Sequence, residues 1–163
     1  MPRLSTILGL AATLITSAAA QTTCVPNFSS SKVFVFVSGT WSASPVAAGT
    51  TIIPVDSSSV SFAVTQDSAQ NYSFRTAGGS LAVSGTSGAL TLQTTSNTDV
   101  LQKYKITCTD CNVFGNPATA RGCQIRPSST TSQCVTNFGT GQAVSAIGCS
   151  GFAPGQYWHF NAV

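Results

Sequence analysis

Few side chains in this sequence could take part in chemistry. The 163 residues include one histidine, His159, and no glutamate; the acidic side chains are Asp56, Asp67, Asp99 and Asp110. A nucleophilic triad would have to use His159, which follows Trp158 in an alternating segment and should face outward. Asp67 and Asp99 each precede a glutamine by three residues, a place where a carboxylate typically caps a turn. We therefore expect no catalytic residues and no paired-carboxylate chemistry.

The six cysteines predict three disulfides rather than a metal site. They are Cys24, Cys108, Cys111, Cys123, Cys134 and Cys149. Cys108-x-x-Cys111 could elsewhere bind zinc, but one histidine and the lack of a second such pair argue against a metal or any cofactor. Cys134 and Cys149 should pair, because they close one hairpin. A disulfide that closes a loop of that length stabilises a fold by about 3 kcal/mol. The other four allow three pairings, of which Cys24–Cys108 with Cys111–Cys123 is favoured.

The chain begins like an exported protein. Residues 1–20 have a positive start at Arg3, an apolar run and a small-residue end at Ala18–Ala20, which predicts a secretory signal peptide. Residues 21–163 would then form a single disulfide-bonded extracellular domain, with no later segment apolar enough for a membrane span. Two glycosylation motifs follow, at Asn27 and Asn71.

Composition predicts an all-β fold. Only 7% of residues are charged, whereas valine and threonine are frequent. The sparse lysine and arginine argue against a nucleic-acid partner. Eleven short strand-like segments without a helical period favour a β-barrel or a β-sandwich. They are 33–37 (expected to be buried on both faces), 51–55, 60–64, 72–74, 81–83, 90–92, 104–107, 124–126, 134–136, 144–147 and 158–160.

One pattern occurs three times, as glutamine, any residue, an aromatic residue, any residue and an apolar residue. It starts at Gln70 (with Tyr72), Gln102 (with Tyr104) and Gln156 (with Trp158). Nine glutamines and 9% aromatic residues would give fewer than one Gln-x-aromatic match by chance. The pattern suits the closing strand of a decayed repeat, with the aromatic ring inward and the glutamine amide tying a neighbouring loop. Tyr157 and His159 would face outward.

The last of these segments resembles the ricin B-type β-trefoil family. Cys134-Val135-Thr136, the run from Val144 to Cys149, and Gln156-x-Trp158 match the order of strands in one unit of that family. The resemblance implies a β-trefoil of three decayed repeats extending over residues 28–160. A β-sandwich is the alternative.

The same resemblance implies where sugar would be bound. Sugar-binding members place an aspartate two residues after the first cysteine of a unit and an aromatic residue two before the second. Those positions here are Thr136 and Ile147 in the last unit, Ala82 and Gln93 in the middle one, and Asp56 and Ala63 in the first. None of the three pairs is intact.

These observations predict a secreted, non-catalytic binding protein, and the resemblance to the ricin B-type family alone implies a glycan ligand. One alternative is a hydrolase inhibitor or effector that binds an extracellular protein; another is a structural, wall-associated protein. The candidate ligand contacts are Trp41, in the turn-rich stretch 38–49, together with Tyr157 and His159.

Overall fold

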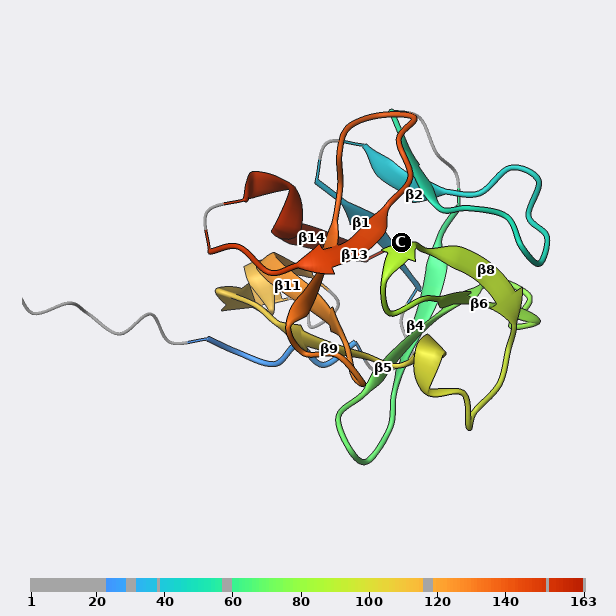
Figure 1. Ribbon diagram of the computed structural model, residues 1–163. Coiled ribbons are helices and arrows are strands. Elements are labelled where there is room, and N and C mark those ends of the chain that lie inside the picture. Colours follow the sequence, from blue (N-terminus) through green and yellow to red (C-terminus); the bar gives the residue numbers. More distant parts are fainter. Residues whose placement is uncertain are drawn as a thin grey trace, which may run out of the picture.

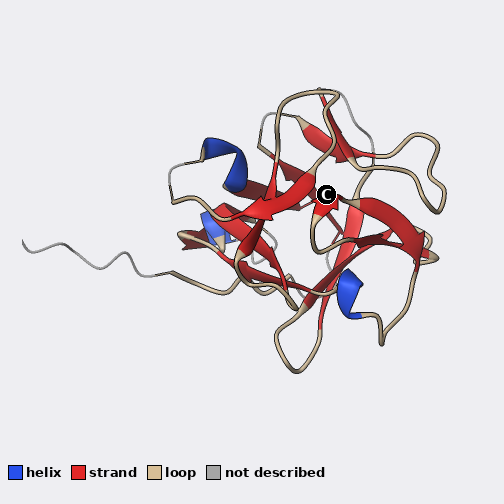
Figure 2. Ribbon diagram, in the orientation of Figure 1, coloured by secondary structure: helices blue, strands red, loops and turns tan. Residues whose placement is uncertain are grey.

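The computed structural model describes residues 23–28, 32–37, 39–56, 60–115, 119–151 and 153–162. The predicted signal peptide lies outside these residues. Strands dominate the described chain, and its three helices are short 3-10 turns (Figure 2). Across those ranges no helix has the length and apolar character needed to cross a bilayer. The prediction of an all-β protein is confirmed.

Twelve of the strands form three consecutive units of four, which Figure 1 shows in blue to teal, green to yellow and orange to red. The first unit has β1 (Lys32–Phe36), β2 (Thr40–Ser42), β3 (Ile53–Val55) and β4 (Phe62–Gln66). The second has β5 (Tyr72–Thr76), β6 (Leu81–Ser84), β8 (Thr91–Thr94) and β9 (Tyr104–Thr107). The third has β11 (Ala120–Pro127), β12 (Gln133–Thr136), β13 (Ser145–Gly148) and β14 (Trp158–Ala162).

Shorter elements lie between these strands. They are β7 (Gly88–Ala89), η1 (Val100–Gln102), β10 (Asp110–Cys111), η2 (Val113–Gly115) and η3 (Pro154–Gln156). The helices η1 and η3 come directly before β9 and β14, the last strands of their units.

The first and last strands of each unit close into a barrel. In the described chain β1 pairs with β4, β4 with β5, β5 with β9, β9 with β11, β11 with β14, and β14 with β1 again. The second and third strands form the hairpins β2–β3, β6–β8 and β12–β13. A closed ring of this kind excludes the alternative of two packed sheets.

The three hairpins meet in a ring of backbone hydrogen bonds. The N–H of Ile52 donates to the C=O of Leu90 at 2.9 Å, that of Leu90 to Val144 at 2.8 Å, and that of Val144 to Ile52 at 2.9 Å. Each residue is fully buried, so the ring satisfies polar groups that water cannot reach. The arrangement is threefold, as the repeat prediction requires.

Equivalent positions of the units fill the barrel. Phe62, Tyr104 and Trp158 occupy the same place on the three closing strands and are all fully buried. Burial of side chains of this size stabilises a fold by roughly 1.5–3 kcal/mol each. The inward side chains Val33 and Val35 of β1 are also fully buried. The side chains of its other face lie outside the described residues, so burial on both faces of this strand stays a prediction.

Trp41 belongs to the core, and its assignment as a ligand contact is wrong. It lies on β2, is fully buried, and has its ring centroid 5.3 Å from that of Phe74 and 5.2 Å from that of Trp158. The equivalent hairpin positions hold the smaller Val83 and Val135. One large ring from the first unit therefore fills space that the other two units leave open.

The three disulfides join Cys134 to Cys149, Cys24 to Cys111, and Cys108 to Cys123. The first confirms the hairpin prediction, whereas the favoured pairing of the other four is wrong. Register explains the outcome: β9 and β11 place Cys108 beside Cys123, and both side chains point into the core. Cys24 pairs with Cys108 through backbone hydrogen bonds, while its sulfur reaches Cys111 on β10.

Candidate ligand-binding site

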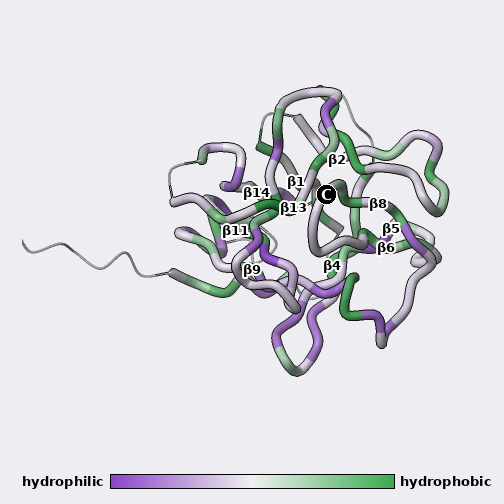
Figure 3. The backbone as a smooth tube through the Cα atoms, in the orientation of Figure 1, coloured by the Kyte–Doolittle hydropathy of each residue, from purple (hydrophilic) through white to green (hydrophobic). Residues whose placement is uncertain are grey.

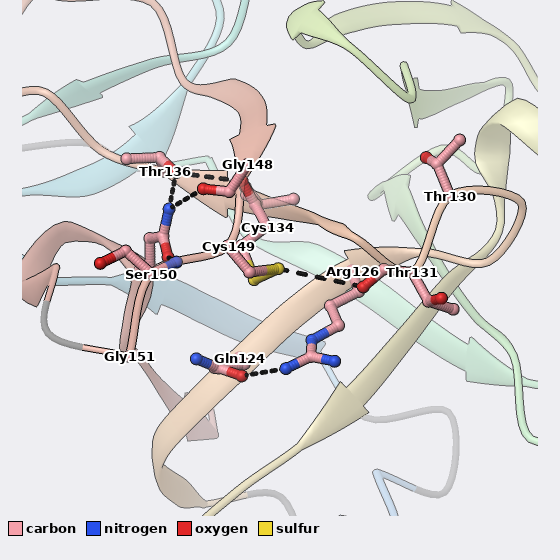
Figure 4. Close-up of a disulfide and its surroundings, with 12 residues drawn as sticks. Gln124, Arg126, Thr130, Thr131, Cys134, Thr136, Gly148, Cys149, Ser150 and Gly151 are labelled. Carbon is pink, nitrogen blue, oxygen red and sulfur yellow. Dashed lines mark hydrogen bonds between the residues drawn. A yellow bond between two sulfur atoms is a disulfide. The ribbon is translucent and has the colours of Figure 1, made fainter.

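Two glutamines of the repeated pattern hold their units together as predicted. Gln156 is 1% exposed; its Nε2 donates to Gly148 C=O at 3.0 Å and to Thr136 Oγ1 at 3.0 Å (Figure 4). Its Oε1 accepts the N–H of Ser150 at 2.7 Å. The same bridge exists in the middle unit, where Gln102 donates from Nε2 to Thr94 C=O at 2.8 Å. Each amide thus ties the end of a hairpin to the closing strand of its unit.

The third glutamine, Gln70, makes no such bridge, and its assignment to a closing strand is wrong. Gln70 is exposed at φ +59° in the turn between β4 and β5, so Tyr72 opens the middle unit rather than closing the first. The first unit closes on Phe62 instead, and Val60 occupies its glutamine position. An apolar residue there cannot make the bridge, which is why a search requiring glutamine missed this unit.

Strand register also moves three of the six inferred sugar positions. In the first unit the residues equivalent to Thr136 and Ile147 are Ser42 and Val55, and not Asp56 and Ala63. Thr136 faces Ser145 across β12–β13, and the equivalent pair on β6–β8 is Ser84 and Thr91. The residue equivalent to Thr136 is therefore Ser84 and not Ala82. Gln93 is the equivalent of Ile147, as the sequence comparison proposed.

Ser84 and Gln93 line an open cavity of about 500 Å³ on the middle unit. The other polar lining residues are Thr91, Thr94, Asp99 and Gln102, and Leu101 adds an apolar wall. Ser84 is 5% exposed, yet its hydroxyl makes no hydrogen bond to the described residues. The equivalent hydroxyl in the last unit, that of Thr136, is bonded to Gln156. The middle unit therefore differs from the last one in leaving this hydroxyl at a cavity.

The neighbours of Ser84 are a mixed set of donors and acceptors. The exposed amide of Gln93 donates from Nε2 to Thr91 Oγ1 at 3.2 Å. Asp99 caps η1, because its Oδ1 accepts the N–H of Leu101 at 2.9 Å. The turn-capping role predicted for Asp99 is thereby confirmed, while its Oδ2 accepts nothing from the described residues.

The floor of the cavity is anchored by Tyr104. Its hydroxyl donates to the C=O of Gly85, another lining residue, at 3.3 Å. Burial, and to a smaller extent the charge of Asp99, raise the pKa of Tyr104 well above the usual value. The phenol therefore stays protonated and keeps donating at any physiological pH. The cavity offers a hydroxyl, an amide and a carboxylate, an arrangement that can hydrogen-bond a polar ligand.

Tyr157 and His159 lie away from this cavity. His159 on β14 and Tyr157 directly before this strand are both partly exposed, which confirms the predicted alternation with Trp158 and Phe160. The hydroxyl of Tyr157 donates to Gly151 C=O at 3.0 Å. Burial, followed by the charge of Arg121, lowers the pKa of His159 below 6.5. Their role as ligand contacts stays a prediction, as does the absence of a catalytic residue.

The two glycosylation motifs differ in their surroundings. Asn27 is exposed, although Ser29 of its motif lies outside the described residues. Asn71 is partly buried, and its Nδ2 donates to both carboxylate oxygens of Asp67 at 3.2 and 3.1 Å. The carboxylate also accepts the N–H groups of Ala69 and Asn71, so Asp67 caps the turn as predicted. Glycosylation at either asparagine stays a prediction.

The sequence predicted no metal site, and the described side chains that could bind a metal bear on that prediction. Across the parts of the chain that the structure describes, no three His, Cys, Asp or Glu side chains gather where they could hold an ion. All six cysteines are in disulfides. The described residues therefore offer no set of metal ligands.

No protein-family model matches the sequence, and no curated protein matches it. Solved structures do match. A chain of a mosquitocidal holotoxin is similar with a TM-score of 0.66 and 12% identity; the match covers 82% of this chain and 17% of that one, so this chain spans about a sixth of its length. The designed 3-fold symmetric protein ThreeFoil has a TM-score of 0.61 at 9% identity, covering 81% and 99% of the two chains. The β-trefoil BEL has a TM-score of 0.58 at 8% identity, covering 86% and 97%. At these identities the likeness concerns the fold alone, and it agrees with the closed barrel and its three hairpins: the chain is a β-trefoil.

Proposed function

We propose that this protein is a secreted, non-catalytic binding protein of the Gln-x-Trp type, and that its middle unit binds a glycan. The observation that carries the proposal is the cavity at Ser84 and Gln93. It lies at the positions where the ricin B-type resemblance locates a sugar site, and its volume of about 500 Å³ suits a small ligand. The disulfides are compatible with an extracellular location.

The chemistry of the lining supports a polyhydroxylated ligand. A saccharide hydroxyl can both donate and accept, and the cavity presents both kinds of partner in Gln93, Ser84 and Asp99. The exposed part of Leu101, 44% of its surface, can cover the C–H face of a sugar ring. No aromatic ring lines this cavity. We therefore expect recognition by hydrogen bonds rather than by stacking, with correspondingly modest affinity.

A glycan array followed by calorimetry tests the proposal. The wild-type protein should retain at least one neutral oligosaccharide. Gln93→Ala should weaken its binding about tenfold, the effect of losing one to two hydrogen bonds. Gln142→Ala is the matched control, because Gln142 is also exposed but lies in a turn of the third unit. Failure of the wild-type protein to bind any glycan, or equal weakening by both substitutions, would contradict the proposal.

A second function, binding of an extracellular protein, is favoured by one different observation. Phe138 is 56% exposed in the loop after β12 and borders an open cavity of about 330 Å³ with Val37 and Pro154. A protruding ring beside an apolar hollow is a common anchor in protein interfaces. Inhibition assays against secreted proteases and glycosidases test this function: Phe138→Ala should relieve any inhibition that the wild-type protein causes, whereas Gln93→Ala should not.

A further inference from the structure

Two cationic residues lie at directly opposite positions of a strand pair on the outside of the barrel. Lys105 of β9 and Arg126 of β11 are directly opposite in the antiparallel register, and both are partly exposed. Like charges at opposite positions of a strand pair repel each other and destabilise it. The pair therefore needs a compensating group close by.

Carboxylates of the described residues lie near two other cations, but none lies near Lys105 or Arg126. Lys103 lies 3.6 Å from the carboxylate of Asp67, and Arg121 is opposite Asp110 in the pairing of β10 with β11. No described carboxylate is within ion-pair distance of Lys105 or Arg126. The repulsion between Lys105 and Arg126 is thus left without a protein counter-charge.

Neutral oxygen atoms hold both side chains in place instead. The ammonium group of Lys105 donates to the C=O of Ala69, in the hydrophilic β4–β5 hairpin below β9 (Figure 3). Arg126 donates from Nη2 to Gln124 Oε1 at 2.7 Å, with the two end groups turned toward each other on one face of β11 (Figure 4). Each cation is therefore positioned while most of its donors stay available to an anion.

Neutral polar groups continue from this pair along the same strands. Thr107 is opposite Gln124, and both border a cavity of about 140 Å³ together with Tyr157. Tyr157 thus adds an aromatic ring at the far end of the strip. The strip, defined by Lys105, Arg126, Gln124, Thr107 and Tyr157, has two cations at one end and hydrogen-bonding groups along the rest.

We propose that this basic strip binds the sulfate or carboxylate group of an acidic glycan. An oxyanion placed between Lys105 and Arg126 cancels their repulsion and accepts charge-assisted hydrogen bonds from both. The neutral end of the strip, at Gln124 and Tyr157, then contacts the adjoining sugar. The glycan class rests on the proposed function, but the strip uses residues of β9 and β11 with Tyr157, and none of the residues that line the middle-unit cavity.

The test compares three immobilised polymers: dextran sulfate, polygalacturonate and neutral dextran. The wild-type protein should bind at least one of the two acidic polymers at low salt, and the preference between them identifies a sulfate or a carboxylate as the anion. Lys105→Gln and Arg126→Gln should each weaken this binding about tenfold or more, and rising salt should abolish it. Circular dichroism spectra should show each variant folded.

Arg121→Gln is the charge-matched control, because Arg121 is exposed on the same strand but faces Asp110. It should leave binding of the acidic polymers within about twofold of wild type. Equal weakening by Arg121→Gln would mean that only net charge matters and would overturn the proposal, as would failure to bind either acidic polymer. Gln93→Ala separates the two sites. If this variant loses the neutral ligand and still binds the acidic polymers, the proposed strip stands. If it keeps the neutral ligand and loses the acidic polymers, the proposed strip fails while the proposed function stands.

Discussion

Gln156 and Thr136 are hydrogen-bonded to each other inside the third unit, with Nε2 of the amide 3.0 Å from Oγ1 of the hydroxyl. Thr136 occupies the place where the resemblance implies a sugar-binding aspartate, and here it serves the internal bridge instead. In the middle unit Gln102 makes its bridge through Thr94 C=O and leaves Ser84 to the cavity. Two units with the same frame therefore place equivalent hydroxyls in different surroundings: one is bonded within its unit, and the other borders a cavity.

The internal bridge predicts a large loss of stability in Gln156→Ala. Removing the amide breaks all three hydrogen bonds of Gln156 and empties a buried site, at a cost of about 3 kcal/mol of unfolding free energy. Gln102→Ala should lose about 2 kcal/mol for the same reason. Gln70→Ala, at the exposed turn, should stay within about 0.5 kcal/mol of wild type. Guanidinium denaturation measures all three, and an equal effect at Gln70 would refute the assignment of the bridge.

Trp41 should matter to folding rather than to ligand binding. Trp41→Ala empties a fully buried site between Phe74 and Trp158 and should lower the unfolding free energy by about 4 kcal/mol. Trp41→Phe keeps most of the contact area and should cost less. Val46→Ala is a control at a side chain that is 53% exposed. Thermal unfolding ranks the variants, and a stable Trp41→Ala protein with altered glycan binding would reverse this interpretation.

The disulfide pairing can be read from unreduced peptides. Cleavage before Asp110 and after Arg121 separates Cys108, Cys111 and Cys123 into different fragments. Mass spectrometry should then find the fragment of Cys111 joined to that of Cys24, and the fragment of Cys108 joined to that of Cys123. A fragment pair joining Cys111 to Cys123 would contradict the structure.

Close backbone packing predicts a strong effect at Gly155. A Cβ atom at this position would lie 2.3 Å from the C=O oxygen of Asn137, whose N–H donates to Gly155 C=O. Gly155→Ala should therefore cost about 2 kcal/mol of unfolding free energy, since the backbone must shift. At Gly151 a Cβ would meet nothing within 4 Å, so Gly151→Ala should be nearly neutral. Chemical denaturation of both variants compares the two positions.

His159 predicts a pH dependence of stability. Burial and then Arg121 lower its pKa in the folded state below the unfolded value of 6.5, so the unfolded chain binds the proton more readily. Its contribution to stability is therefore present above pH 6.5 and is lost as pH falls through the folded-state pKa. His159→Gln should flatten the decline of the melting temperature in this window. An unchanged pH profile would show that the imidazole does not titrate with unfolding.

Much of the architecture could be inferred from composition and local pattern. Low charge and short valine- and threonine-rich segments specify strands, and strand alternation alone places Trp158 inward and His159 outward. The hairpin disulfide Cys134–Cys149 could also be predicted from the sequence, because its two cysteines are close along the chain. Such features depend on neighbours in sequence.

Features that depend on register could not be obtained in this way. Whether Gln70 or Val60 precedes the closing strand of the first unit is decided by which strands pair across the barrel, and the same pairing joins Cys108 to Cys123. Trp41 became a core residue because the equivalent positions of two distant hairpins hold only valine.

The sequence by itself determined a β protein with three related units and the identities of the groups available for binding. The tertiary structure alone decided which of those groups meet: Ser84 with Gln93 at a cavity, and Lys105 with Arg126 on the barrel wall. The physical reason is that strand alternation is a local property of the backbone, whereas a site is made by long-range pairing, in which a shift of one residue turns every side chain to the opposite face.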